Sequence, residues 1–153
     1  MKRQQKYPDT STFHFHNENP KNRVTGDCAF RAIATALEIP YNQVVMEMAE
    51  MHCKTGYAIN DKKGIEKYLA SKGWVKQSQP RKDDNTKYTG TEFCEQLQDD
   101  PWIFTGKEYD YNARIVAMIG GHHIVAIVGG KVYDIWDSTD GCIGNYWVKG
   151  RAA

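Results

Sequence analysis

The sequence predicts an α+β domain with helices first and an antiparallel sheet afterwards. Apolar residues recur at helical spacing between residues 28 and 97, whereas apolar runs of strand length dominate from residue 114 onward. Gly129-Gly130 stands between two such runs and is a strong hairpin signal. The chain has 153 residues, 41% of them hydrophobic and 25% charged, which is typical of one globular domain with a core of its own.

The overall composition excludes several classes of protein. A formal net charge of +1 gives no field that would attract nucleic acid, and no run approaches the ~20 apolar residues of a membrane span. The basic start lacks an apolar segment after it, so no signal peptide is expected. Four cysteines lie far apart without a CxxC pair, which favours reduced thiols in a cytoplasmic compartment. They are Cys28, Cys53, Cys94 and Cys142.

Residues 1–23 are polar and predict an irregular arm packed on a domain formed by residues 24–153. Within the arm, the alternation over residues 13–15 predicts a short strand. His14 and His16 could bind a metal as a pair, but no further ligands follow at metal spacing. We therefore expect neither a metal nor a cofactor.

The helical part of the chain contains several separate elements. Helices are expected over residues 28–37, from Tyr41 or Asn42 to His52, over residues 64–72 and over residues 91–97. Gly73 is expected at the C′ position of the third helix, and a short strand is expected at 74–76. Gln77–Lys87 is a polar connector, and we expect it to border a cleft together with the Tyr109–Asn112 loop.

Cys28 comes directly after a turn and opens an apolar helix. Thr25-Gly26 supplies the turn, and Asp27 is a good N-cap whose carboxylate can accept from free N–H groups. Cys28 then lies at the positive end of the helix, where a thiolate is favoured and where free N–H groups can stabilise an oxyanion. The alternative is a cysteine that serves only as a small apolar residue.

A histidine pair and two carboxylates flank the predicted hairpin. His122 and His123 precede its first strand, and Asp134 and Asp137 follow the Gly129-Gly130 turn. A cysteine nucleophile needs a base, and the base needs a group that fixes its other nitrogen. An imidazole beside a carboxylate on the next strand meets that need.

The register of the hairpin decides which carboxylate meets which histidine. A two-residue turn places His122 opposite Asp137 and His123 opposite Trp136, and leaves Asp134 on the face of His123. A three-residue or bulged loop places His123 opposite Asp137. The sequence leaves both registers open.

A cysteine at the start of a buried helix, a late strand histidine and then an acidic residue resembles the papain-like cysteine peptidases. The residues around Cys28 resemble the small bacterial peptidases that cleave double-glycine leaders, in which a Gln, four residues and an acidic residue precede the cysteine. Asn22 stands here in place of that Gln. The resemblance implies a papain-like fold with Cys28 as nucleophile, His123 as base, Asp137 as orienting residue and Asn22 as oxyanion donor, with His122 as the alternative base.

The sequence around Cys28 and around the hairpin also resembles small proteins carried by bacteriophages. By this resemblance the expected function is a cysteine peptidase or related amide hydrolase that acts on a peptide or protein through a thioester. The alternatives are a Cys-His-Asp acyltransferase, an inactive papain-like fold that binds a protein partner, and zinc binding through Cys28 and the two histidines. Candidate aromatic anchors for a partner are Trp74, Trp102, Tyr109, Tyr111 and Trp147.

Overall fold

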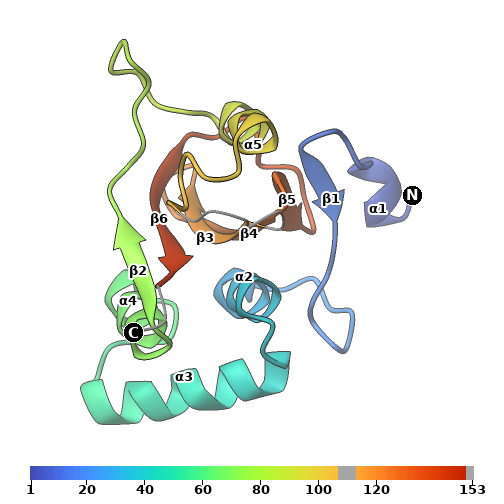
Figure 1. The fold of residues 1–153 in the computed structure, drawn as a ribbon. Coiled ribbons are helices and arrows are strands. Elements are labelled where there is room, and N and C mark those ends of the chain that lie inside the picture. Colours follow the sequence, from blue (N-terminus) through green and yellow to red (C-terminus); the bar gives the residue numbers. More distant parts are fainter. Residues whose placement is uncertain (107–112, 151–153) are drawn as a thin grey trace.

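The chain folds around one mixed six-stranded sheet; the computed structural model describes residues 1–106 and 113–150 (Figure 1). The strands are β1 (Phe13–Phe15), β2 (Trp74–Gln77), β3 (Arg114–Ile119), β4 (His123–Val128), β5 (Lys131–Asp134) and β6 (Ile143–Lys149). They lie in the order β1-β5-β4-β3-β6-β2. β1 runs parallel to β5, and every other neighbouring pair is antiparallel.

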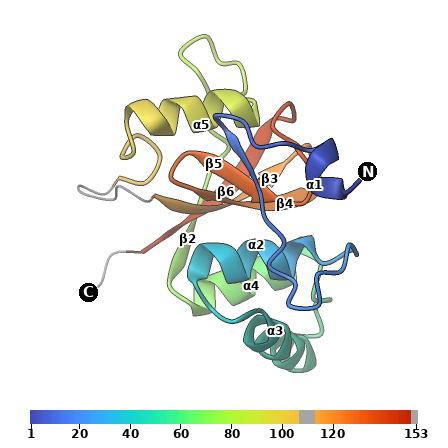
Figure 2. The same ribbon diagram turned by 90° about the vertical axis from the view of Figure 1, so that its right-hand side faces the viewer.

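Helices cover both faces of this sheet. They are α1 (Arg3–Lys6), α2 (Cys28–Leu37), α3 (Tyr41–Thr55), α4 (Lys62–Ser71) and α5 (Gly90–Asp99). α2, α3 and α4 lie on one side of the sheet and α5 lies on the other (Figure 2). The predicted α+β class is therefore confirmed, with the Cys28 helix packed on a mostly antiparallel sheet.

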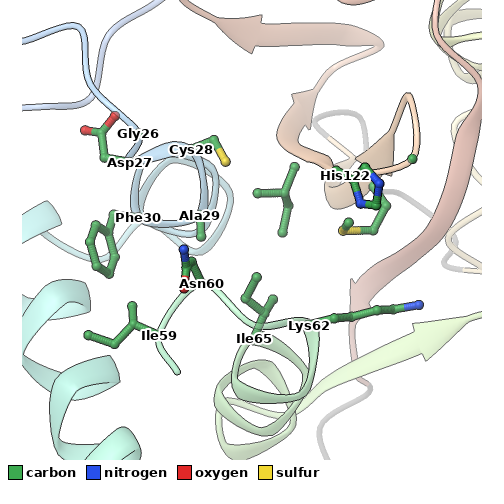
Figure 3. Close-up of a pocket in the computed structure, with 13 residues that line it drawn as sticks. Gly26, Asp27, Cys28, Ala29, Phe30, Ile59, Asn60, Lys62, Ile65 and His122 are labelled. Atoms are coloured by element: carbon green, nitrogen blue, oxygen red, sulfur yellow. The ribbon is translucent and has the colours of Figure 1, made fainter. Parts of the chain in front are cut away.

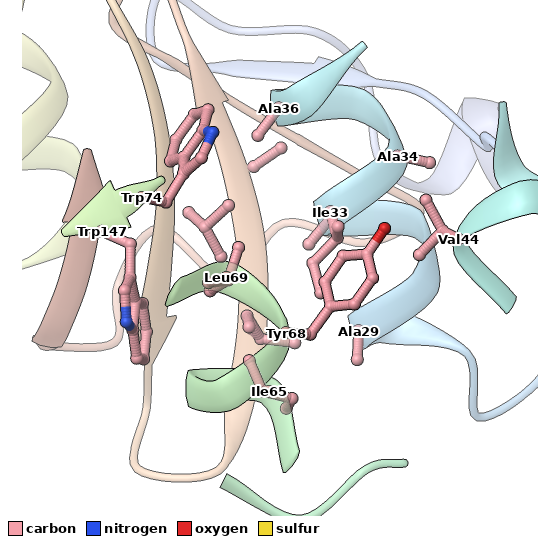
Figure 4. Packing of buried hydrophobic residues seen from close by; sticks show 14 of the residues in the cluster. Ala29, Ile33, Ala34, Ala36, Val44, Ile65, Tyr68, Leu69, Trp74 and Trp147 are labelled. Atoms are coloured by element: carbon pink, nitrogen blue, oxygen red, sulfur yellow. The ribbon is translucent and has the colours of Figure 1, made fainter. Parts of the chain in front are cut away.

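β4 is apolar from Ile124 to Val128 because both faces of the sheet are buried at this strand. Along β4, Ile124 and Ala126 belong to the cluster that contains α2, α3 and α4, whereas Val125 and Ile127 belong to the cluster that contains α5. Figure 4 shows the first cluster, in which Tyr68 of α4 lies beside Ile33 of α2. This packing fixes the position of α2 on the sheet.

Most predicted elements are present with shifts of a few residues at their ends. The 13–15 strand of the arm is confirmed as β1, while the four-residue α1 was not predicted. The 41–52 helix continues to Thr55, where Gly56 in the left-handed region ends it. The Tyr109–Asn112 loop lies outside the described residues. No described helix is both long and apolar enough to cross a membrane.

The β4–β5 hairpin has the two-residue turn. Val128 pairs with Lys131, and Gly129 and Gly130 have φ values of 57° and 75°. Two consecutive positive φ values are the requirement of a type I′ turn, which glycine meets at the lowest cost. The three-residue register, which would place His123 opposite Asp137, is therefore wrong.

Gly64 allows the loop before α4 to lie against that helix. A Cβ at this position would meet the Ala58 carbonyl oxygen at 2.4 Å, so no other residue fits without a backbone shift. This close approach holds Ile59 and Asn60 next to the N-terminus of α2, where both line the pocket described below.

Candidate active site

Cys28 is the first residue of α2, as predicted, and its side chain is half-buried. Asp27 occupies the N-cap position, but its side chain makes no cap hydrogen bond. The expectation that this carboxylate caps the helix is therefore wrong. Its oxygens instead accept hydrogen bonds from Arg31 and Tyr41 (2.8 and 2.7 Å) and from Asn19 (2.9 Å). As a result, the backbone N–H groups at the start of α2 donate no hydrogen bond to the Asp27 side chain and can donate to another acceptor.

His123 is the first residue of β4, and its imidazole contacts a carboxylate and interacts electrostatically with Cys28. Its Nε2 lies 2.5 Å from Oδ2 of Asp134, the last residue of β5. Nδ1, the other ring nitrogen, is then left to interact with Cys28, whose pKa His123 lowers. The ring of Trp136 lies beside the imidazole, with 4.9 Å between the ring centroids. The imidazole of His123 thus interacts with the Cys28 thiol and with the Asp134 carboxylate.

The expectation that Asp137 orients His123 is wrong, because the two-residue turn places Asp134 on the face of His123. Asp137 Oδ1 instead accepts hydrogen bonds from the backbone N–H and the hydroxyl of Thr139, at 3.0 and 2.6 Å. Asp137 thus stabilises the turn after β5. The residue held open as the alternative, Asp134, is the one that contacts His123.

Arg31 extends these interactions, and the sequence reasoning did not identify it. Its Nη1 lies 2.6 Å from Asp134 Oδ1, and its Nε lies 2.8 Å from Asp27 Oδ1. All three side chains are at most 7% exposed. A buried guanidinium between two carboxylates is held by charge-assisted hydrogen bonds. Two signals were visible: an arginine inside an otherwise apolar helix, and an acidic residue four positions before it.

The surroundings shift the pKa values of Cys28 and His123 in opposite directions. Burial raises the pKa of the Cys28 thiol, but the hydrogen bond and positive charge of His123 outweigh it, so the pKa lies below its ordinary value. Burial lowers the pKa of His123, yet the contacts with Asp134 and Cys28 raise it to about 9. Both directions favour a thiolate paired with an imidazolium.

The structure does not bring the other predicted site residues into this set of interactions. Asn22 lies on an exposed turn at φ 54°, where its side-chain oxygen faces Asn17 Nδ2 at 3.5 Å. It is not among the described residues that line the pocket at Cys28. His122 is exposed in the turn between β3 and β4 and lines that pocket. The adjacent His123 contacts Asp134 and lowers the pKa of Cys28.

A pocket of about 180 Å³ adjoins Cys28, between the N-terminus of α2, the start of α4 and the β3–β4 turn (Figure 3). We call it the Cys28 pocket. Its apolar lining consists of Ala29, Phe30, Ile59, Ile65, Met118 and Ile124. Asn60, Lys62 and His122 add polar groups. The nucleophile candidate therefore borders a space that suits an apolar side chain.

Two further alternatives are metal binding and binding of a protein partner. Within residues 1–106 and 113–150, no group of three or more His, Cys, Asp or Glu side chains could hold a metal ion. His14 and His16 contact Asp9 and Glu18 respectively. Of the candidate aromatic anchors, Trp74 and Trp147 are buried in the core, whereas Trp102 is exposed. Tyr109 and Tyr111 lie outside the described residues.

Comparison of the chain with protein-family models, with curated proteins and with solved structures finds no match.

Proposed function

We propose that this protein is a cysteine peptidase or a related amide hydrolase of the papain-like type. Cys28 acts as the nucleophile, His123 as the general acid and base, and Asp134 as the residue that orients the imidazole. The observation that carries the proposal is the His123–Asp134 contact together with Cys28, whose pKa His123 lowers and which stands at the start of a buried helix.

In the proposed reaction, the Cys28 thiolate attacks a peptide carbonyl carbon. The imidazolium Nδ1–H then donates its proton to the leaving nitrogen, the C–N bond breaks and a thioester remains on Cys28. A water molecule gives a proton to the neutral imidazole as it attacks the thioester, and the thiolate leaves. Throughout these steps, the contact of Asp134 with Nε2 keeps Nδ1 directed at Cys28.

The start of α2 supplies donors for the oxyanion. Because the Asp27 side chain makes no cap hydrogen bond, the first N–H groups of the helix, including that of Cys28, can receive a developing negative charge. This role needs no side-chain amide, and Asn22 is not required for it.

The test is hydrolysis of a peptide library by the wild-type protein, with the thioester trapped at acidic pH and located by mass spectrometry. We expect new peptide ends and an acyl group on Cys28, both absent in Cys28→Ala. A library left intact by folded wild-type protein would contradict the proposal.

Added glycinamide distinguishes hydrolysis from acyl transfer, because a transferase forms the corresponding amides instead of free acids.

A further inference from the structure

A second hollow continues from the Cys28 pocket across the surface. It is lined by residues of the β2–α5 connection, the β3–β4 turn and β6, including Gln79, Lys87, Cys142 and Asn145. Lys62, Met118 and Gly121 line both spaces, so the two hollows adjoin along these residues. Together they form an extended depression, which we call the Lys62–Lys87 groove.

The groove is apolar at Cys28 and basic farther along. Lys62 and Lys87 both line its outer part, where none of the described lining residues carries a carboxylate. Lys62 Nζ donates a hydrogen bond to a neutral group, Asn145 Oδ1, at 2.8 Å. Figure 3 shows the Lys62 side chain extending away from Cys28. The lysines therefore add positive charge at a distance from the nucleophile.

The carboxylate that lines the inner part does not cancel this charge. Asp27 borders the Cys28 pocket, but its oxygens accept from Arg31, Tyr41 and Asn19. The pocket beside Cys28, at about 180 Å³, is smaller than the ~300 Å³ of a small drug site and suits one side chain of a longer chain.

We propose that the Lys62–Lys87 groove binds an acidic segment of the substrate polypeptide, with an apolar side chain in the Cys28 pocket and acidic side chains beside Lys62 and Lys87. This inference rests on the proposed function and specifies its substrate class. Charge complementarity is the argument: a basic hollow without a carboxylate of its own favours Asp or Glu and disfavours Lys or Arg.

The experiment measures protection of Cys28 from iodoacetamide by short peptides, so it requires binding and no turnover. Each peptide holds one leucine flanked on both sides by Glu, Gln or Lys. Alkylation of Cys28 is compared with that of the exposed Cys53 in the same sample by mass spectrometry. We expect Glu peptides to protect Cys28 at concentrations about tenfold lower than Lys peptides at low salt, and this preference to shrink as salt is added.

The double variant Lys62→Gln/Lys87→Gln removes both charges and keeps polar side chains. We expect the Glu-over-Lys preference to fall below about threefold in this variant, and Lys131→Gln, a matched change at the far end of β5, to keep the wild-type preference. Equal protection by Glu and Lys peptides, or a preference that survives the double variant, would overturn the inference. Peptide cleavage in those same samples shows separately whether the proposed function stands.

Discussion

Arg31 Nη1 lies 2.6 Å from Asp134 Oδ1, in an ion pair that joins the helix of Cys28 to the strand of Asp134. Arg31 Nε also contacts Asp27, which is the residue directly before Cys28 in the chain. One guanidinium thus connects both ends of the candidate site. Because all of these groups are buried, their charges act on Cys28 and His123 with little screening by solvent.

Replacing Arg31 with Met removes the positive charge and leaves two buried carboxylates without it. The pKa of Cys28 should rise, because Arg31 contributes to stabilising the thiolate. We expect the rise in alkylation rate with pH to move to higher pH, and the free energy of unfolding to fall by about 3–5 kcal/mol. Urea unfolding and pH-dependent alkylation measure the two effects. Unchanged alkylation in folded Arg31→Met protein would contradict this account.

Replacing Asp27 with Asn removes a negative charge from the same network and should act in the opposite direction. The pKa of Cys28 is expected to fall, because Arg31 then has only one carboxylate partner. Tyr41→Phe is the matched control: it removes one hydrogen bond to Asp27 without changing the charge, at a cost of about 1 kcal/mol. Shifts of the same sign in Arg31→Met and Asp27→Asn would mean that the network acts on Cys28 through packing alone.

Asp134→Ala and Asp137→Ala separate the two carboxylates that follow the hairpin turn. Loss of Asp134 removes the contact that orients His123, so we expect peptide hydrolysis to fall by about 100-fold or more. Asp137→Ala loses only its contacts with Thr139 and should stay within about threefold of wild type. The values of kcat/KM for both variants test this order, and the reverse order would assign the orienting role to Asp137.

The four cysteines should differ sharply in reactivity. Cys94 is fully buried between α5 and the sheet, and burial raises its pKa to about 12. We expect iodoacetamide at neutral pH to modify Cys28 first, exposed Cys53 and Cys142 more slowly, and Cys94 only after unfolding in urea. Site-resolved mass spectrometry over a time course gives the order. Labelling of Cys94 together with Cys53 in native protein would contradict the described core.

Much of the fold was predictable because local signals determine it. The period of the apolar residues located α2 and the strands, and the Gly129-Gly130 pair marked the hairpin. Cys28 and His123 were identified because each stands at the edge of such an element, where a polar group is conspicuous.

The partners of these two residues were harder to predict, because they depend on tertiary contacts. Asp134 and Asp137 differ by three positions, and only the backbone conformation of the turn decides which one faces His123. Asp27 has the residue type of an N-cap, but Arg31 competes for its carboxylate. The preference of Asp27 for an N-cap hydrogen bond was outweighed because the buried guanidinium of Arg31 requires a negatively charged partner.

The measurement that tests the central claim most directly is the pH dependence of iodoacetamide alkylation at Cys28, in wild type and in His123→Ala. Because the pKa of Cys28 is lowered and that of His123 is raised to about 9, we expect a thiolate–imidazolium pair in the pH range between the two pKa values. We predict fast alkylation well below the free-thiol pKa of about 8.5 in wild type. In His123→Ala this reactivity should be lost, because burial then raises the thiol pKa unopposed by the imidazolium. Slow alkylation that follows an ordinary thiol in both proteins would contradict the account and make Cys28 a structural residue.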